Sequence, residues 1–208
     1  VNFILVILLR NNYKFSLNKK HIINCIYFSV PLIPGWLINM YLNRASIFYL
    51  QAYKSIEEVG LYSISERLAG IASIVMATFF LAWNPISNKI INEIENHFIY
   101  DLVLRLFLFF SSTMIILTTF YSKEILILFT TKEFYPAYKY SGFVAIGTMT
   151  WYANYFLGQG IIISKKTVYQ SIARSIGAIA ATFIFIKFIR IYSIYGASIG
   201  MSVGYLMG

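Results

Sequence analysis

Three charged residues lie inside long apolar stretches of the sequence, where a full charge is energetically costly. Glu66 and Arg67 are adjacent in the stretch VGLYSISERLAGIASIVMATFFLAW (59–83), and Arg44 lies in the preceding stretch, 22–50. Adjacent residues on a helix point about 100° apart around its axis, so Glu66 and Arg67 cannot readily neutralise each other. A charge at the centre of a bilayer costs about 2.5 to 3.5 kcal/mol on insertion scales, and such residues normally face a bundle interior or a water-filled cavity. These residues therefore favour the binding of a charged ligand within a membrane.

The depth of these charges predicts how they pair. Glu66 follows Val59 by seven residues and Arg44 precedes Leu50 by six, which places both about 9 to 10 Å inside the same membrane surface at about 1.5 Å per residue. We therefore predict an ion pair between Arg44 and Glu66 on two antiparallel helices, which leaves Arg67 for an anionic ligand. Snorkelling to the lipid headgroups and a purely structural pair are the alternatives.

Two more arginines, Arg105 and Arg174, are weaker candidates for the same cavity. Each lies near the opposite end of its apolar stretch, where arginine commonly anchors a helix at the lipid headgroups. Aromatic residues inside the stretches either stack on sugar rings or mark the membrane interface; they include Tyr62, Trp151, Tyr152 and Tyr155. The candidate site residues are Arg44, Glu66, Arg67, Arg105 and Arg174.

The sequence contains none of the patterns that usually indicate an enzyme or a metal site. It has no metal-ligand cluster, no glycine-rich phosphate loop before a lysine, and no nucleophile beside a base. The single cysteine, Cys25, lies in an apolar stretch, so neither a disulfide nor a cysteine-based metal site is possible. We predict a protein that binds and moves its ligand without a cofactor or metal, rather than an enzyme.

The composition places these residues in a membrane. The chain of 208 residues is 59% hydrophobic and 12% charged, whereas soluble domains average about 45–50% apolar and about 25% charged residues. Its net charge of +9 comes from lysines and arginines that lie mostly at the ends of apolar stretches, where they contact headgroups and fix orientation. No basic face for nucleic acid is formed. The chain is therefore predicted to be an all-α integral membrane protein.

Apolar stretches of membrane-spanning length, about 20 residues for a hydrocarbon core of about 30 Å, recur along the chain. They predict a multi-helix transporter bundle in one membrane domain, with five complete and two partial spans. A break is expected at Pro31 and Pro34. The polar stretch after Trp83 carries isoleucines at helical spacing and predicts an amphipathic helix on the membrane surface. The complete spans are 22–50, 59–83, 102–121, 142–164 and 168–189, the partial spans are 1–9 and 192–208, and the surface helix is 86–98.

Charge and glycine patterns predict the orientation and packing of these helices. The first loop carries four basic residues and the second carries one, which favours placing 11–20 in the cytoplasm. In the last stretch, glycines recur at every fourth residue from Gly196 to Gly208, a spacing that lets membrane helices pack closely. The stretch 142–164 contains irregularly spaced glycines beside Asn154, which predicts a helix that can bend.

The segment NRASIFYLQAYKSIEEVGLYSISERLAGIASIVMATFFLAWNPISNK resembles the polysaccharide biosynthesis family of membrane transporters, the O-antigen flippase type. That family belongs to the exporter superfamily that also contains multidrug and toxin extrusion pumps and lipid II flippases. The order and spacing of several short features carry the resemblance, which covers about 31–208. These features are Arg44 after a long helix, EEVGLYS (57–63), AWNP (82–85), FTTKEFYPAYKY (129–140), SKKT (164–167) and YGASIGMSVGY (195–205).

The resemblance implies flipping of undecaprenyl-pyrophosphate-linked oligosaccharide across the bacterial inner membrane, for surface polysaccharide synthesis, by alternating access coupled to H⁺ or Na⁺. The implied partners are the lipid-linked oligosaccharide, membrane lipids and other polysaccharide assembly proteins of the membrane. The sequence departs from some members at Asn43, where they have an acidic residue. Because the chain starts and stops within apolar stretches, we expect it to be a fragment that supplies most of the second half of a larger bundle.

Two other functions fit the same residues. A drug or cation extruder of the same superfamily would favour acidic residues in its cavity, and Glu66 is the one acidic residue within the predicted spans. A membrane enzyme acting on a polyprenyl-linked glycan would need a large polar extracytoplasmic loop, and the longest predicted loop on that side is about 122–140. The flippase is therefore the main expectation.

Overall fold

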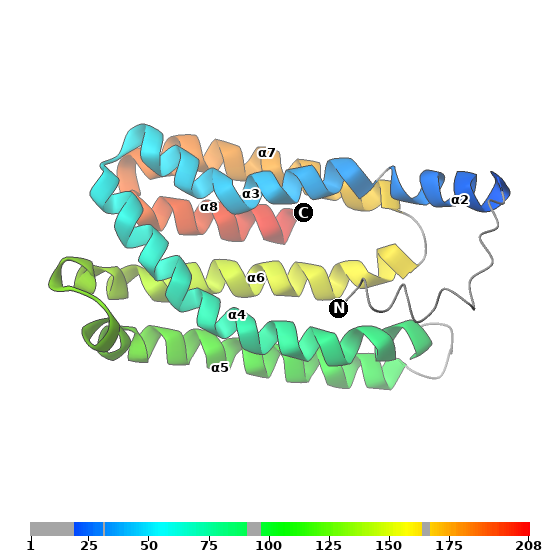
Figure 1. Cartoon of the computed structure of the whole chain (residues 1–208), viewed down its shortest axis with the longest axis horizontal. Coiled ribbons are helices and arrows are strands. Elements are labelled where there is room, and N and C mark those ends of the chain that lie inside the picture. Colours follow the sequence, from blue (N-terminus) through cyan, green and yellow to red (C-terminus); the bar gives the residue numbers. More distant parts are fainter. Residues whose placement is uncertain (1–18, 31, 91–96, 164–166) are drawn as a thin grey trace, which may run out of the picture.

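The structure is a computed structural model that describes residues 19–30, 32–90, 97–163 and 167–208. Every regular element in these ranges is helical, and the elements follow one another as an antiparallel bundle (Figure 1). The α-helices are α2 (Lys19–Ser29), α3 (Leu32–Tyr53), α4 (Ile56–Ile90), α5 (His97–Phe129), α6 (Tyr138–Ile163), α7 (Thr167–Tyr192) and α8 (Ile194–Met207), and the 3₁₀-helix η2 (Lys132–Ala137) joins α5 to α6.

Four segments of the described chain are long and apolar enough to cross a membrane. They are Cys25–Tyr53, Ile56–Ser87, Phe98–Phe129 and Val168–Tyr192. The chain is thus an all-α integral membrane protein, as its composition predicts. The predicted span 142–164 corresponds to α6, which has 26 residues but is not among these four segments. Because α6 packs against α4, α5 and α8, its polar side chains face protein rather than lipid.

The break predicted at the two prolines is confirmed. Helix α2 ends at Ser29 and α3 begins at Leu32, with Val30 in a turn. The Val30 N–H donates to the Ile26 carbonyl at 2.9 Å, which closes the end of α2. Pro34 falls in the first turn of α3, where a backbone N–H has no intrahelical acceptor and its absence costs little.

Helix α4 is longer than its apolar stretch at both ends. The backbone N–H of Glu58 donates to Ser55 Oγ at 3.3 Å, and Glu57 and Glu58 stand in the first turn, where negative charge favours a helix. At its far end α4 continues through Pro85 to Ile90. The predicted surface helix 86–98 is therefore not a separate element in the described ranges: 86–90 belong to α4, 97–98 to α5, and 91–96 lie outside them, as does the predicted partial span 1–9.

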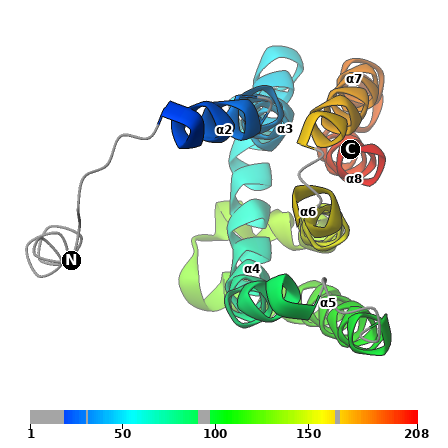
Figure 2. The same ribbon diagram turned by 90° about the vertical axis from the view of Figure 1, so that its right-hand side faces the viewer.

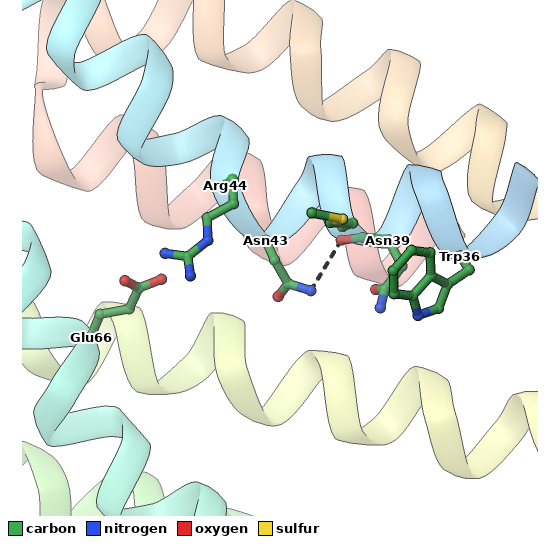
Figure 3. Close-up of a pocket in the computed structure, with 6 residues that line it drawn as sticks. Trp36, Asn39, Asn43, Arg44 and Glu66 are labelled. Atoms are coloured by element: carbon green, nitrogen blue, oxygen red, sulfur yellow. Dashed lines mark hydrogen bonds between the residues drawn. The ribbon is translucent and has the colours of Figure 1, made fainter.

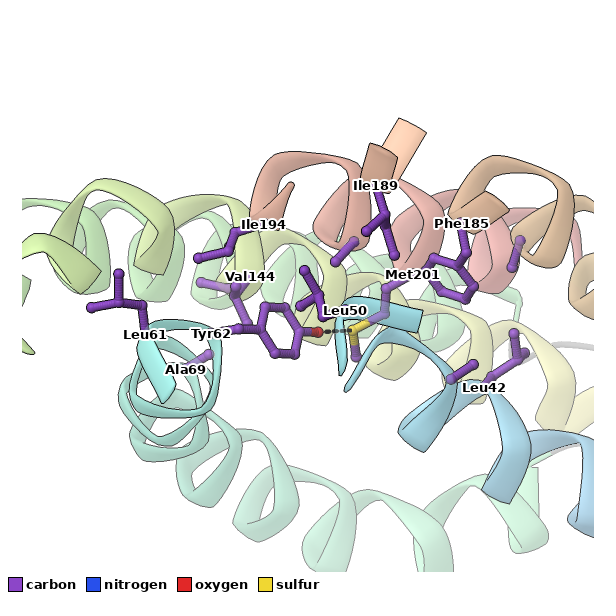
Figure 4. Packing of buried hydrophobic residues seen from close by; sticks show 14 of the residues in the cluster. Leu42, Leu50, Leu61, Tyr62, Ala69, Val144, Phe185, Ile189, Ile194 and Met201 are labelled. Atoms are coloured by element: carbon purple, nitrogen blue, oxygen red, sulfur yellow. Dashed lines mark hydrogen bonds between the residues drawn. The ribbon is translucent and has the colours of Figure 1, made fainter. Parts of the chain in front are cut away.

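The helices form two groups with α6 between them. Figures 1 and 2 show α3, α7 and α8 on one side, and α5 with the second part of α4 on the other. One buried cluster joins α3, the first part of α4, α6, α7 and α8 and also includes Leu126 of α5 (Figure 4). A second cluster, rich in aromatic rings, joins the second part of α4 to α5 and α6 through Met76, Phe80, Trp83, Phe107 and Phe156. Helix α4 thus connects the two groups.

Helices α7 and α8 pack through glycines, as the four-residue spacing predicts. A Cβ atom at Gly177 would collide with the carbonyl oxygen of Gly204, and one at Gly200 would lie 2.5 Å from the ring of Phe185. The turn between these helices places Ser193 at φ 49°, and its hydroxyl donates to the Glu58 carboxylate at 2.6 Å. The close approach fixes α8 against α7 and turns its other side toward α6 and α3.

Candidate functional site

One face of α3 carries a polar and aromatic stripe in the middle of the bundle. Trp36, Asn39, Met40, Asn43 and Arg44 recur at intervals of three and four residues, so a helix places them on the same side. Together with Glu66 of α4 they line a cavity of about 590 Å³ (Figure 3). The sequence singled out Arg44 and Glu66, whereas Trp36, Asn39 and Met40 were missed even though their spacing was visible.

Two smaller cavities continue this one, because they share lining residues with it. Trp36 and Asn39 also line a cavity of about 180 Å³, and Asn43 and Glu66 also line a cavity of about 310 Å³. Trp151 of α6 lines both smaller cavities. The three adjacent cavities lie between α3, α4, α6, α7 and α8, and we call them together the cleft. Its remaining lining residues are Leu42, Gly70, Ser73, Thr148, Tyr152, Asn154, Tyr155, Arg174, Met201, Gly204, Tyr205 and Gly208.

Hydrogen bonds from two aromatic side chains fix the amides of the stripe. The indole Nε1–H of Trp151 donates to Asn39 Oδ1 at 3.1 Å, and the hydroxyl of Tyr205 donates to Asn43 Oδ1 at 2.8 Å. Because an indole N–H only donates, it must face the oxygen of Asn39. The NH₂ group of Asn39 is then the end that remains for a ligand. Asn43 Nδ2 donates to the Asn39 carbonyl at 3.0 Å, which orients the second amide.

The predicted ion pair between Arg44 and Glu66 is not formed. Figure 3 shows the two side chains pointing toward one another across the cavity. Among the described residues the one ion pair is between Arg105 and Asp101, at 2.7 Å. The reason is the course of the helices: α3 and α4 diverge from their connection at 54–55, so equal depth does not bring these two side chains into contact (Figure 1).

The structure brings three of the five candidate site residues to the cleft. Arg44 and Glu66 line its largest cavity, and the half-buried Arg174 lines the smallest, where its Nη1 donates to the Gly35 carbonyl at 3.3 Å. Arg67, the residue predicted to bind an anionic ligand, is exposed and lines none of these cavities, because it points about 100° away from Glu66 around α4. Arg105 is also outside the cleft, on α5.

The geometry suits an anionic ligand that also carries polar hydroxyl groups. Two guanidinium groups and the amide of Asn39 supply N–H donors, whereas Asn154 Nδ2 donates to the Tyr205 carbonyl at 2.9 Å. The rings of Trp36 and Trp151 supply flat apolar surfaces. In the described part of the chain, no group of three or more His, Cys, Asp or Glu side chains could hold a metal ion.

No family model matches the chain, and neither a curated protein nor a solved structure matches it. We therefore infer the function of the cleft from the chemistry of the residues that line it.

Proposed function

We propose that this chain moves a lipid-linked, pyrophosphate-bearing oligosaccharide across the bacterial inner membrane, as the flippase family that its sequence resembles does. One observation carries the proposal: Arg44, inside an apolar helix, faces a cavity of about 590 Å³ and has no ion-pair partner in the described chain. Arginine is always charged, and Glu66 faces Arg44 across the cavity without forming an ion pair (Figure 3), so a ligand or water between them is needed to compensate for the cost of the charge in a membrane helix.

The chemistry of the ligand follows from the side chains around Arg44. A pyrophosphate carries several negative charges, and a guanidinium group binds phosphate oxygens through paired N–H groups. The low dielectric constant of a membrane interior strengthens this attraction. The sugar rings would stack on Trp36 and Trp151 and bond the amide of Asn39, while the polyprenyl tail stays in the lipid.

Glu66 favours a second candidate, an exporter of organic cations. Its carboxylate is half-buried and lines two of the three cavities. A cationic ligand would bind Glu66 and be repelled by Arg44. The anionic ligand is preferred because the cleft contains two arginines and, among the described lining residues, one carboxylate.

A scrambling experiment tests the proposal on the whole chain. The purified protein is reconstituted into liposomes that contain a fluorescent polyprenyl-pyrophosphate disaccharide, and a membrane-impermeant reductant bleaches the outer leaflet. We expect the inner-leaflet probe to become accessible with protein and to stay protected in protein-free vesicles. Continued protection with protein present, together with transport of a fluorescent organic cation, would replace the flippase by the cation exporter.

A further inference from the structure

Helix α4 contributes to the two buried clusters with different parts of its length. Its first part contributes Leu61, Tyr62 and Ala69 to the cluster shared with α3, α6, α7 and α8. Its second part, from Ala72 onward, contributes to the aromatic cluster shared with α5 and α6. In Figures 1 and 2 the first part crosses obliquely from one helix group to the other, and the second part runs alongside α5. The helix therefore changes direction where it passes from one cluster to the other.

Three features that weaken a helix coincide at this change of direction. Gly70 lies between the two clusters, and glycine lowers helix stability relative to alanine. The hydroxyl of Ser73 bonds back to the Ala69 carbonyl at 3.3 Å, an arrangement that often bends helices. The Tyr152 hydroxyl of α6 donates to the Ser73 carbonyl at 2.9 Å, and insertion of a side chain at a helix carbonyl is one cause of helix kinks.

The surroundings of this turn leave room for movement. A Cβ atom at Gly70 would meet no other atom within 4 Å. Gly70 and Ser73 line the cavity of about 310 Å³ together with Glu66, so a change of bend would alter the shape of the cleft directly.

The first part of α4 is held firmly, which makes the second part the one that moves. The buried Tyr62 hydroxyl donates to Ser46 of α3 at 2.9 Å, and the Ser65 hydroxyl donates to the Ala137 carbonyl at 3.0 Å. The second part has ring contacts with both α5 and α6: the centroid of Phe80 lies 5.9 Å from that of Phe107 and 4.8 Å from that of Tyr155. A rotation at the intervening turn would therefore move α5 together with the second part of α4 and slide this cluster along α6.

We propose that residues 70–73 are a hinge in α4, about which the second part of α4 and α5 swing relative to α3 and thereby widen and narrow the cleft. The use of this motion for transport rests on the proposed function. The hinge itself is a property of the helix and is measured without substrate.

Distances between two spin labels test the hinge. In a Cys25→Ser background, nitroxides are attached to cysteines replacing Ile33 of α3 and Leu81 of α4, which are both exposed and outside the cleft. We expect two distance populations in the parent. In Gly70→Ala the minor population should fall about fivefold, because alanine fits the open space and favours the uninterrupted helix.

Gly160→Ala is the matched control. Gly160 is also helical, and a Cβ atom there would also meet no other atom within 4 Å, but it lies in α6 and not at the bend. This variant should keep the distance distribution of the parent. A single narrow distribution in the parent, or identical distributions in the parent and Gly70→Ala, would overturn the hinge.

Tyr152→Phe tests the contribution of α6 to the hinge. Loss of the hydroxyl removes the hydrogen bond by which α6 holds the Ser73 carbonyl at the bend, so the mean distance should shift while both populations remain. An unchanged mean would contradict the role of Tyr152. These outcomes are independent of the scrambling experiment. A rigid α4 would overturn the hinge even if the glycan probe crosses the membrane. A mobile hinge would stand even if the glycan probe does not cross.

Discussion

At the scale of single residues, a substitution of Arg44 tests ligand binding without disturbing the packing of the core. Its side chain is exposed to the cleft, and in the described chain it has neither a hydrogen bond nor an ion pair. Arg44→Ala therefore removes a charge without opening the core. Hydrogen bonds to charged groups contribute about 1.5 to 3 kcal/mol, so we expect the apparent affinity for the polyprenyl-pyrophosphate probe to fall about 10- to 100-fold. The concentration dependence of scrambling measures this change.

Arg105→Ala is the control for surface charge. Arg105 is 76% exposed and pairs with Asp101 one helical turn away on α5, outside the cleft. It should leave the apparent affinity unchanged, since exposed pairs contribute little and no ligand contact is lost. Equal losses in Arg44→Ala and Arg105→Ala would mean that the net charge of the protein, rather than the cleft, attracts the probe.

Glu66→Gln distinguishes the two candidate ligand classes. The change keeps the size of the side chain and removes a negative charge that faces Arg44 across the cavity. Binding of the anionic probe should tighten, because the repelling carboxylate is gone, whereas an organic cation would bind more weakly. Affinities of both probes measured on the same variant decide the matter, and weaker binding of the anionic probe would contradict its placement beside Glu66.

The sequence located the charged residues of the cleft but not their contacts. The cost of burying charge in a membrane pointed to Arg44 and Glu66, and both line the cleft. Their pairing failed because depth along two helices says nothing about the distance between the helix axes. The stripe of Trp36, Asn39 and Asn43 had a visible helical spacing, but it became evidence of a site only once α6 placed Trp151 against it.

At the scale of elements, apolar length predicted where the helices cross the membrane but not where they end. Helices α4 and α5 continue past their apolar stretches because a helix end depends on local capping and on neighbours, as the Ser55 cap of α4 shows. The polar helix α6 was predicted as a span and occupies the centre of the bundle. Hydropathy alone does not reveal that position, since it averages the sides that face lipid and protein.

The contact between α7 and α8 yields a stability prediction. Gly177→Ala places a methyl group against the backbone oxygen of Gly204, which cannot rotate away as a side chain would. Overpacking of this kind typically costs about 1 to 3 kcal/mol, and we expect a corresponding loss in the free energy of unfolding in detergent, followed by circular dichroism. Gly160→Ala, in open space, should be as stable as the parent or slightly more so. Equal stability of Gly177→Ala and the parent would show that the two helices separate freely.

At the scale of the whole molecule, three helix connections lie at the same end of the bundle (Figure 1). There the ends of α3, α5 and α7 are joined to the starts of α4, α6 and α8, and the Arg190 guanidinium lies 4.4 Å from the ring centre of Tyr53. From there α3 and α4 diverge toward the end that contains Lys89 (Figure 1). The largest cavity extends along α3 from Arg44 to Trp36, and Trp36 lies near the start of α3, at the Lys89 end of the bundle (Figure 1). In the proposed function the ligand therefore enters from the Lys89 end, and the orientation in the membrane decides the direction of transport.

The distribution of basic residues predicts that the Lys89 end is cytoplasmic. Cysteines replacing Lys89 and Lys132, both exposed and at opposite ends of the bundle, test this in a Cys25→Ser background. We expect a membrane-impermeant maleimide to label Lys132→Cys in intact cells, and Lys89→Cys only after permeabilisation. The reverse labelling pattern would place the Lys89 end of the bundle, and with it the entrance of the cleft, outside the cell, where an exporter releases its ligand. It would thus contradict both the predicted orientation and loading of the lipid-linked glycan in the state seen here.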